Sequence, residues 1–285
     1  MNRNIIFNPT KSLMLCIVFM FLTAQIGFAQ SKLGRAEDSL NEKRDRGGTS
    51  SEHNSSSFDD DDNPFVAAIA YYVAEAVLAV SYYTLIESPS EFESNSSLAG
   101  LTKYPYYSAN KGNYTYDLET EETSFFRAGI SSRYISENNN LKGMHLNLDM
   151  RFLKRLGVEV DYMQLWEDNP NFGKDNLAIF SLLAQYHRVR TQKFDVKWGV
   201  GTSYVAGNVN QFGFAYGLGS ELFFSKPLSL EINFNQTFIN TETINKFNGL
   251  LNYHVDRYKF TGGYEHLRIG NQNFSMVSVG VGVFF

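Results

Sequence analysis

The sequence predicts an all-β fold, an antiparallel transmembrane β-barrel of about ten strands, preceded by a disordered tether and one apolar helix. Three features support this prediction: a secretory signal at the N-terminus, alternating apolar and polar residues from residue 123 onward, and a last strand that ends in an aromatic residue. Alternation lowers a hydropathy average, because a polar residue separates each pair of apolar ones. A mean hydropathy of −0.27 therefore agrees with a chain that is 43% hydrophobic and 15% aromatic.

Residues 1–29 have the layout of a secretory signal peptide. Basic residues accompany an apolar run from Ser12 to Phe28, and a small-residue stretch ends in Ala29, after which we expect cleavage. Gln30 then begins the mature chain, and because it is not a cysteine we expect no lipid anchor. The one cysteine of the sequence, Cys16, is lost with the signal, which leaves no thiol for a disulfide, a metal or a nucleophile.

The charge of the chain argues against nucleic acid as a partner. The net charge is −5, and removing the signal takes away two basic residues and no acidic one, so the mature chain carries about −7. The sequence contains no phosphate-binding loop, dinucleotide-binding fingerprint, zinc-ligand spacing or nucleophile elbow. We therefore expect no cofactor, no metal and no catalytic residue.

Three segments precede the predicted barrel. Residues 30–63 are polar and end in a run of aspartates, which predicts a disordered acidic linker. Residues 64–88 contain a predicted apolar helix over 64–86, whose apolar character is interrupted only at Glu75. The helix is long enough to cross a bilayer, but the carboxylate at its middle favours packing against protein or lying at the membrane surface. Residues 89–122 show no periodicity and predict an ordered, irregular connector.

The barrel is predicted over residues 123–285, where the pattern has a period of two, as β-strands require. Segment 141–153 shows it most clearly, with apolar side chains at even positions and polar ones at odd positions. The predicted strands are 123–135, 141–153, 156–167, 176–189, 193–206, 211–224, 228–240, 244–256, 258–268 and 272–285. Ten is an even number, as in single-chain bacterial barrels, and short turns alternate with slightly longer loops, which puts both ends of the barrel chain in the periplasm.

One face of each predicted strand points into the lumen. Its charged and histidine side chains form the predicted lumen charge network: Arg127, Arg133, His145, Asp149, Arg151, Glu159, Asp161, Asp195, Lys197, Glu221, Glu231, His254, Asp256, Lys259 and Glu265. One tight turn would set Arg151 opposite Glu159, and another would set Asp256 opposite Lys259. Because both signs of charge are mixed, we expect a structural network that fills a narrow lumen and leaves no wide water path.

The end of the last predicted strand, Ser278–Phe285, alternates and finishes in an aromatic residue. Together with the signal peptide and the even strand count, it resembles small outer-membrane β-barrel proteins of Bacteroidota, and the likeness covers somewhat more than the C-terminal half. The resemblance implies a Gram-negative outer-membrane location and implies that the barrel-assembly machinery recognises Phe285. The family that the chain resembles is uncharacterised, so the resemblance implies a location and a fold but no activity. The expected partners are outer-membrane lipid, the assembly machinery and another outer-membrane or periplasmic protein.

Three classes of function remain open. A structural, assembly or scaffold component would dock a partner through its N-terminal helix and tether, whereas a narrow passive channel would conduct through the lumen. A hydrolase would act at the outer rim with His and Asp residues, as ten-stranded outer-membrane proteases do, but His254 and Asp256 fall near a predicted periplasmic turn. A simple channel has no use for an apolar helix after an acidic tether, and so the N-terminal extension favours the structural class.

Overall fold

The computed structural model describes residues 31–41, 99–108, 110–119, 122–153, 155–169, 173–240 and 242–285. The predicted signal peptide (1–29) and apolar helix (64–88) lie outside these residues, as does most of the predicted linker. Within the described part of the chain, ten long strands form one closed barrel, accompanied by two short strands and one helix.

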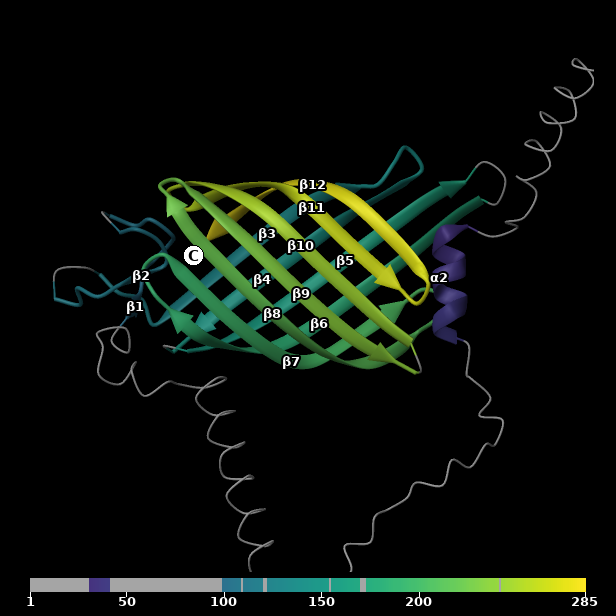
Figure 1. Cartoon of the computed structure of the whole chain (residues 1–285), viewed down its shortest axis with the longest axis horizontal. Coiled ribbons are helices and arrows are strands. Elements are labelled where there is room, and N and C mark those ends of the chain that lie inside the picture. Colours follow the sequence, from purple (N-terminus) through teal and green to yellow (C-terminus); the bar gives the residue numbers. More distant parts are fainter. Residues whose placement is uncertain are drawn as a thin grey trace, which may run out of the picture.

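The barrel is antiparallel and closes in chain order (Figure 1). Its strands are β3 (Phe126–Ser136), β4 (Leu141–Phe152), β5 (Leu156–Asn169), β6 (Gly173–Arg190), β7 (Phe194–Ala206), β8 (Gln211–Ser225), β9 (Leu228–Ile239), β10 (Glu242–Val255), β11 (Tyr258–Ile269) and β12 (Gln272–Phe284). Each strand pairs with the next along the chain, and β12 pairs with β3 to close the ring. Every predicted strand is present, with bounds that differ by at most about three residues. The predicted fold class is confirmed.

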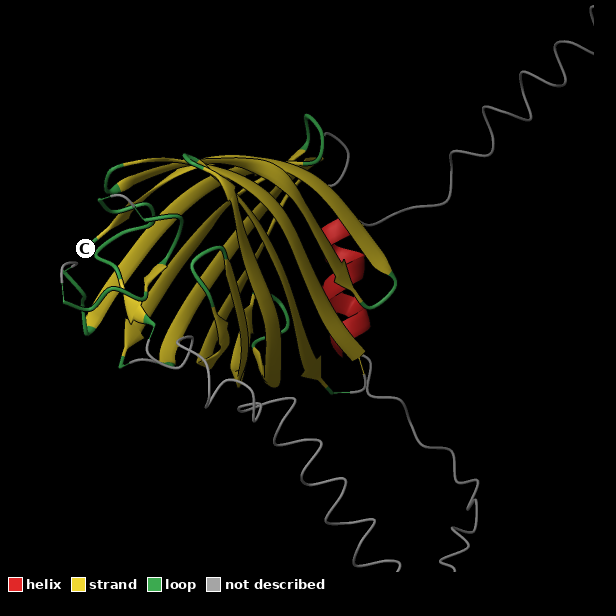
Figure 2. Ribbon diagram, turned by 60° about the vertical axis from the view of Figure 1, so that its left-hand side comes forward, coloured by secondary structure: helices red, strands yellow, loops and turns green. Residues whose placement is uncertain are grey.

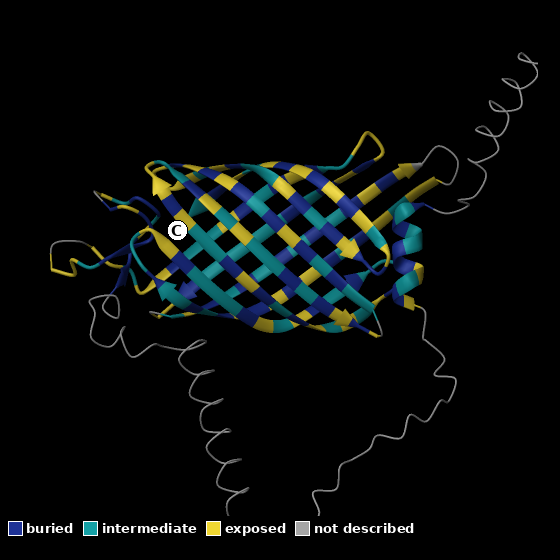
Figure 3. Cartoon of the chain, in the orientation of Figure 1, coloured by how far each residue is buried: buried dark blue, intermediate teal, exposed yellow. Residues whose placement is uncertain are grey.

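Alternation sorts the side chains of the strands between the outside and the lumen (Figure 3). On β12, Val277, Val279 and Val281 are 65%, 58% and 55% exposed, whereas Ser278 between them is 1% exposed. Outward positions on other strands are also apolar or aromatic, as at Phe214. A closed sheet pairs its backbone polar groups internally and has no free edge, which is what hydrocarbon surroundings require. The molecule is therefore a transmembrane β-barrel.

The two ends of the barrel differ in what covers them. We call the end where β3 begins and β12 finishes the terminal end, and the opposite end the helix end. The connections at the helix end are residues 137–140, 170–172, 207–210, 240–241 and 270–271, and those at the terminal end are residues 153–155, 191–193, 226–227 and 256–257. Both sets are short, so loop length distinguishes the two ends only slightly. The periplasmic position of the terminal end stays a prediction.

A short helix, α2 (Lys32–Asn41), lies across the helix end; it is purple in Figure 1 and red in Figure 2. The prediction that residues 30–63 are disordered is wrong for this part of the linker. Leu33, Ala36 and Leu40 recur at helical spacing and are fully buried against the barrel. Three apolar residues in so short a segment do not stabilise a helix by themselves, and the barrel end supplies the surface that they need. No helix among the described residues is long and apolar enough to span a membrane.

The connector covers the terminal end. It contains β1 (Gly100–Leu101) and β2 (Tyr114–Thr115), which pair as a small antiparallel sheet beside the barrel mouth (Figure 1). Ala99, Leu101 and Tyr114 pack together and are buried. Each end of the barrel is therefore covered by a part of the chain that precedes the first barrel strand.

Candidate functional site

The lumen begins, beneath α2, with an apolar layer. Its barrel residues are Ile135, Leu141, Met163, Leu165, Leu177, Ile179, Val205, Val209, Ile239, Ile244, Leu267, Ile269, Phe274 and Met276. They form one buried cluster with the apolar face of α2, including Leu33 and Leu40. The inward positions of the strands are thus apolar at this end, because they face a helix rather than water. Without a cover, this apolar ring would be exposed to solvent, and α2 is the cover.

The first turn of α2 is held by acidic side chains of the barrel rim. The Glu167 carboxylate accepts hydrogen bonds from the backbone nitrogens of Lys32 (3.1 Å) and Leu33 (2.8 Å). The Lys32 ammonium lies 2.7 Å from the Glu137 carboxylate. A carboxylate at a helix N-terminus satisfies free amides and meets the positive end of the helix dipole. The rim therefore fixes where the helix starts.

The second half of α2 is held by asparagines of two loops. Asn208 donates to the Glu37 carboxylate from its backbone nitrogen (2.9 Å) and from its side-chain amide (2.8 Å). The Asn240 amide donates to the Leu40 carbonyl at 2.8 Å, and the Asn41 amide donates to the Asn208 carbonyl at 3.3 Å. Burial raises the pKa of Glu37 above its ordinary value, and the hydrogen bonds from Asn208 act in the opposite direction. Both ends of the helix therefore have defined polar partners on the barrel.

Below the apolar layer lies a group that we call the histidine cluster: His145, Asp161, Glu265, Arg133 and Lys246. The His145 ring has a carboxylate on each side, with Nε2 2.5 Å from Asp161 and Nδ1 2.5 Å from Glu265. Arg133 Nε donates to Glu265 at 2.7 Å, and Lys246 pairs with Asp161. No side chain of the cluster is more than 4% exposed. Each buried charge has an opposite charge beside it. This pairing offsets the cost of removing the charges from water.

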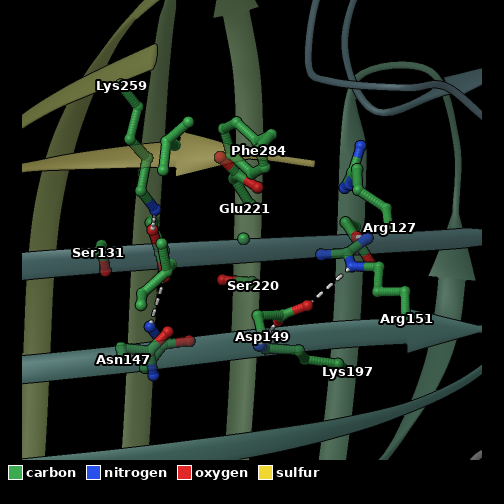
Figure 4. A pocket seen from close by; sticks show the side chains of 16 residues that line it. Arg127, Ser131, Asn147, Asp149, Arg151, Lys197, Ser220, Glu221, Lys259 and Phe284 are labelled. Atoms are coloured by element: carbon green, nitrogen blue, oxygen red, sulfur yellow. Dashed lines mark hydrogen bonds and ion pairs between the residues drawn. The ribbon is translucent and has the colours of Figure 1, made fainter. Parts of the chain in front are cut away.

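Nearer the terminal end lies a second group, the arginine cluster: Arg151, Asp195, Asp149, Lys197 and Glu159. Arg151 Nη1 donates to Asp195 at 2.6 Å, and its Nε donates to Asp149 at 3.2 Å. Lys197 Nζ lies 2.9 Å from Asp149 and 3.1 Å from Glu159. Figure 4 shows the Arg151 and Asp149 side chains next to each other on the inner face of β4, with Lys197 beside Asp149. These pairs tie β4, β5 and β7 together through the interior.

Two glutamates face each other beside the arginine cluster. Glu221 of β8 is directly opposite Glu231 of β9. Like charges in this position repel, and donors on either side offset the repulsion. Ser229 donates to Glu221 at 2.8 Å, and Lys259 and Asn252 contact Glu231 at 3.3 Å and 3.0 Å. The cavity in Figure 4, which these glutamates help to line, measures about 50 Å³ and holds at most a few water molecules.

The connector inserts side chains into the terminal end. The Tyr114 hydroxyl donates to Asp195 at 3.1 Å and lies 3.1 Å from Arg151 Nη1. Arg127 Nη2 donates to the side-chain oxygen of Asn113 at 3.0 Å. Burial raises the pKa of the Tyr114 phenol, so the hydroxyl keeps the proton that it donates. Side chains therefore occupy the lumen at successive levels from α2 at one end to the connector at the other, apart from the cavity beside the arginine cluster.

The structure places most of the predicted lumen charge network inside the barrel: Arg127, Arg133, His145, Asp149, Arg151, Glu159, Asp161, Asp195, Lys197, Glu221, Glu231, His254, Lys259 and Glu265 lie on inward positions. Asp256 does not; it is exposed in the turn after β10, with φ 49°. The predicted pairs are also wrong, because Arg151 lies opposite Gly157 and Lys259 lies opposite His254. Both turns are centred one residue earlier than predicted. The register is therefore shifted by two residues. The same residues face the lumen, but each lies opposite a different residue of the neighbouring strand.

Several residues of these clusters are absent from the predicted lumen charge network. Lys246 shares the inward, even-numbered face of its strand with His254, so the alternation contained the signal for it. Asn113 and Tyr114 carried no such signal, because the connector has no periodicity. Among the described residues, no group of three or more His, Cys, Asp or Glu side chains could hold a metal ion. The side chains of the clusters bind to one another and link neighbouring and opposite strands through the lumen.

No family model matches the chain, and no curated protein matches it. Solved structures are similar to it in fold. An outer-membrane channel from Pseudomonas putida F1 is 10% identical, with a TM-score of 0.37 over 59% of this chain and 98% of that chain. The KdgM porin is 14% identical, with a TM-score of 0.35 over 55% of this chain and 99% of that chain. The outer membrane protein OprG from Pseudomonas aeruginosa is 16% identical, with a TM-score of 0.29 over 56% of this chain and 94% of that chain.

The location of the chain follows from its own surface. A closed barrel of even strand number with an apolar exterior is the form that proteins take in bacterial outer membranes. The chain is an outer-membrane β-barrel.

Proposed function

We propose that the protein has a structural, assembly or scaffold role in the outer membrane: it is a closed barrel, without catalytic activity, that docks a partner through its N-terminal helix and tether. One observation supports this proposal above others. The lumen is occupied at successive levels by α2 with the apolar layer, by the histidine cluster, by the arginine cluster and by the connector. Water-filled channels need a lumen that side chains leave open.

Opening this lumen would be costly. Removing one partner of a buried ion pair typically costs about 3–5 kcal/mol. The lumen contains several such pairs, including Arg133 with Glu265, Arg151 with Asp195, and Lys246 with Asp161. A continuous water path would separate these groups and would also displace α2 and the connector. A barrel that keeps them in place does not conduct steadily.

A narrow channel is the second candidate, and the small cavity of Figure 4 is the observation that favours it. Polar and charged side chains of both signs, such as Arg127 and Glu221, line this space. Lining groups of this kind set the selectivity of narrow pores. In this alternative, α2 and the connector would be gates rather than fixed plugs.

Conductance in planar bilayers separates the two candidates. Purified wild-type protein would be compared with a variant that lacks residues 31–41, both shown to be folded by heat-modifiable migration in gels. The structural proposal expects no steady, salt-proportional conductance from the wild-type protein. Large and stable wild-type channels would overturn it. If only the deletion variant forms channels, the wild-type barrel is closed, as proposed, and α2 is the element that keeps it closed.

The docking part of the proposal has its own test. Extraction in a mild detergent should bring down another outer-membrane or periplasmic protein with the barrel, and deleting residues 64–86, the predicted apolar helix, should lose it while the barrel remains folded. A barrel that purifies alone from membranes contradicts docking. Recognition by the barrel-assembly machinery and kinship with the barrels of Bacteroidota stay predictions from the resemblance.

A further inference from the structure

The outer face of the barrel carries a row of polar side chains across five neighbouring strands, β8 to β12, which Figure 1 shows side by side. The row takes one residue from each strand, and each residue lies directly opposite the next: Tyr216, Gln236, Asn245, Arg268 and Asn273. We call this set the polar row. Its members alternate with the inward residues of their strands, so they face away from the lumen.

Polar side chains are unusual on this face, because the wall around them is apolar. Phe214 and Leu218, on either side of Tyr216 along β8, are 57% and 55% exposed, and Phe238, next to Gln236 on the rim side, is 44% exposed. A polar group beside lipid needs a hydrogen-bond partner. The Tyr216 hydroxyl donates to Gln236 at 2.5 Å, and the Gln236 amide donates to Asn245 at 2.7 Å. The first three members of the row therefore satisfy one another.

The polar row approaches the helix end as it passes from β8 to β12. Tyr216 is the sixth residue of β8 counted from the helix end, whereas Arg268 is the last but one residue of β11 and Asn273 is the second residue of β12. The apolar band of a transmembrane barrel gives way to the lipid headgroups near its rim. The cationic end of the row therefore lies at the level of the headgroups.

Arg268 has donors to spare at this level. It is exposed, and within the described part of the chain its one hydrogen bond runs from Nε to the Gly270 carbonyl at 3.1 Å, with no carboxylate paired to its charge. Asn245 and Asn273 lie opposite it on its two sides, at the separation where side chains of one face meet. The exposed Asn273 amide has no hydrogen-bond partner in the same part of the chain.

We propose that this end of the polar row binds the phosphate group of a membrane lipid, with Arg268 as the cationic group and the amides of Asn245 and Asn273 as further donors. A guanidinium donates two parallel hydrogen bonds to phosphate oxygens, and an amide on each side adds directional contacts. The acyl chains of the same lipid lie along the wall toward the terminal end, where Val277 is 65% exposed and Phe247 is 38% exposed.

The surroundings of the site favour an anion that belongs to a lipid. Glu137 approaches this face, where it accepts a hydrogen bond from the Ser275 backbone nitrogen at 3.0 Å, but the Lys32 ammonium 2.7 Å away matches its charge. The positive charge of Arg268 is therefore not cancelled locally. A lipid offers both a phosphate at headgroup level and chains for the apolar wall, whereas a free phosphate offers only the first. The proposal does not depend on whether the barrel conducts or docks a partner.

Native mass spectrometry of the purified protein tests the proposal. The protein is titrated in detergent with dioleoyl phosphatidic acid, with dioleoylglycerol, which has the same chains and no phosphate, and with inorganic phosphate. Arg268→Gln removes the charge. Asn245→Asp keeps an oxygen for the hydrogen bond from Gln236 and places a carboxylate opposite Arg268, where it competes with the lipid phosphate. Arg257→Gln, in an exposed turn of the terminal end, is the matched control, and heat-modifiable migration shows that each variant is folded.

The expected result is that the wild-type protein and the Arg257 variant retain phosphatidic acid, whereas the Arg268 and Asn245 variants bind it about tenfold more weakly, as the loss of a charge-assisted hydrogen bond predicts. Equal binding by the wild-type protein and both site variants would overturn the proposal, and so would equal affinity of the wild-type protein for dioleoylglycerol or for inorganic phosphate. Wild-type dimers that carry no lipid and that Arg268→Gln dissociates would identify a contact between barrels instead. If Arg268→Gln does not fold, the Asn245 variant decides the outcome.

Discussion

Asn208 donates two hydrogen bonds to the carboxylate of Glu37, a residue 171 positions earlier in the chain. Glu37 is 1% exposed although its own helix faces solvent on the other side. Burial raises its pKa above the ordinary value of 4.5. The docked helix therefore binds this proton more tightly than the free segment does. Docking is favoured most below the ordinary pKa, and this contribution is lost as the pH rises through the raised pKa.

Replacing this carboxylate should remove the pH dependence. Glu37→Gln keeps an oxygen that can accept from Asn208 but carries no charge to be desolvated. We expect α2 amides of the wild-type protein to be better protected from hydrogen exchange at about pH 5 than at about pH 8, a window in which most rim carboxylates stay ionised. In the variant, the α2 amides should be equally protected at both pH values. A variant that keeps the wild-type pH dependence would show that another group is responsible.

The apolar face of α2 should be needed for docking but not for the barrel. Leu40→Asp replaces a fully buried side chain with a charge, which forfeits about 1.5–3 kcal/mol of apolar burial and adds a desolvation cost. We expect trypsin to cleave after Arg35 in the folded variant and not in the wild-type protein, because a released ten-residue helix does not persist. Asp38→Asn, on the exposed face, is the matched control and should resist. Equal resistance of the Leu40 variant would contradict the docked arrangement.

The strands can be predicted from the sequence because the apolar or polar character of each residue indicates whether that residue faces lipid or the lumen. Each outward residue meets lipid and each inward residue meets the lumen, so the alternation on β12 between Val277, Ser278 and Val279 encodes the fold without any knowledge of neighbours. The inward faces follow from the same alternation. A shift of register by two residues leaves those faces unchanged. The sequence therefore predicts which residues face the lumen, but it does not predict which residues pair across neighbouring strands.

The partners depend on contacts that local sequence does not contain. Arg133 and Glu265 lie 132 residues apart and meet only because β12 closes against β3. Asp256 was placed in the lumen because the turn was centred one residue late. α2 has three buried apolar residues, too few to predict a helix in a polar linker, and its stability comes from a barrel end that forms from distant segments.

The C-terminal residue should matter for assembly more than for stability. Phe285 exchanges backbone hydrogen bonds with Ala128 at 2.8 Å and 3.2 Å, and the residue is 68% exposed. Phe285→Ser keeps the backbone bonds, so we expect a barrel of near wild-type heat stability but a lower yield of inserted protein. Phe125→Ser, which removes another exposed aromatic ring at the terminal end, is the control and should insert normally. Equal yields for both variants would argue against an assembly role for the C-terminal ring.

Asp195 should be the most sensitive single carboxylate at the terminal end, because it joins the barrel to the connector. It accepts from Arg151 at 2.6 Å, from Tyr114 at 3.1 Å and from His187 at 3.0 Å, and it is 3% exposed. Asp195→Asn keeps the shape but leaves Arg151 without a buried counter-charge on that side, although Asp149 remains. Losing one member of a buried ion pair lowers the free energy of unfolding by about 3–5 kcal/mol. Because Asp149 still pairs with Arg151, we expect a loss near the lower end of this range.

The measurement is the temperature at which the folded, heat-modifiable band is lost, and it has an internal control. Asp256→Asn removes the same charge from a side chain that the sequence pattern assigned to the lumen and the structure places in an exposed turn. Asparagine tolerates the positive φ of that turn, so this variant should unfold at the wild-type temperature. Asp195→Asn should unfold several degrees lower and should also expose the connector to protease, because Tyr114 loses its charged acceptor. If the two variants lose stability equally, the carboxylate of Asp195 does not join the connector to the barrel, and the closure of the terminal end must rest on Arg127 and Asn113 instead.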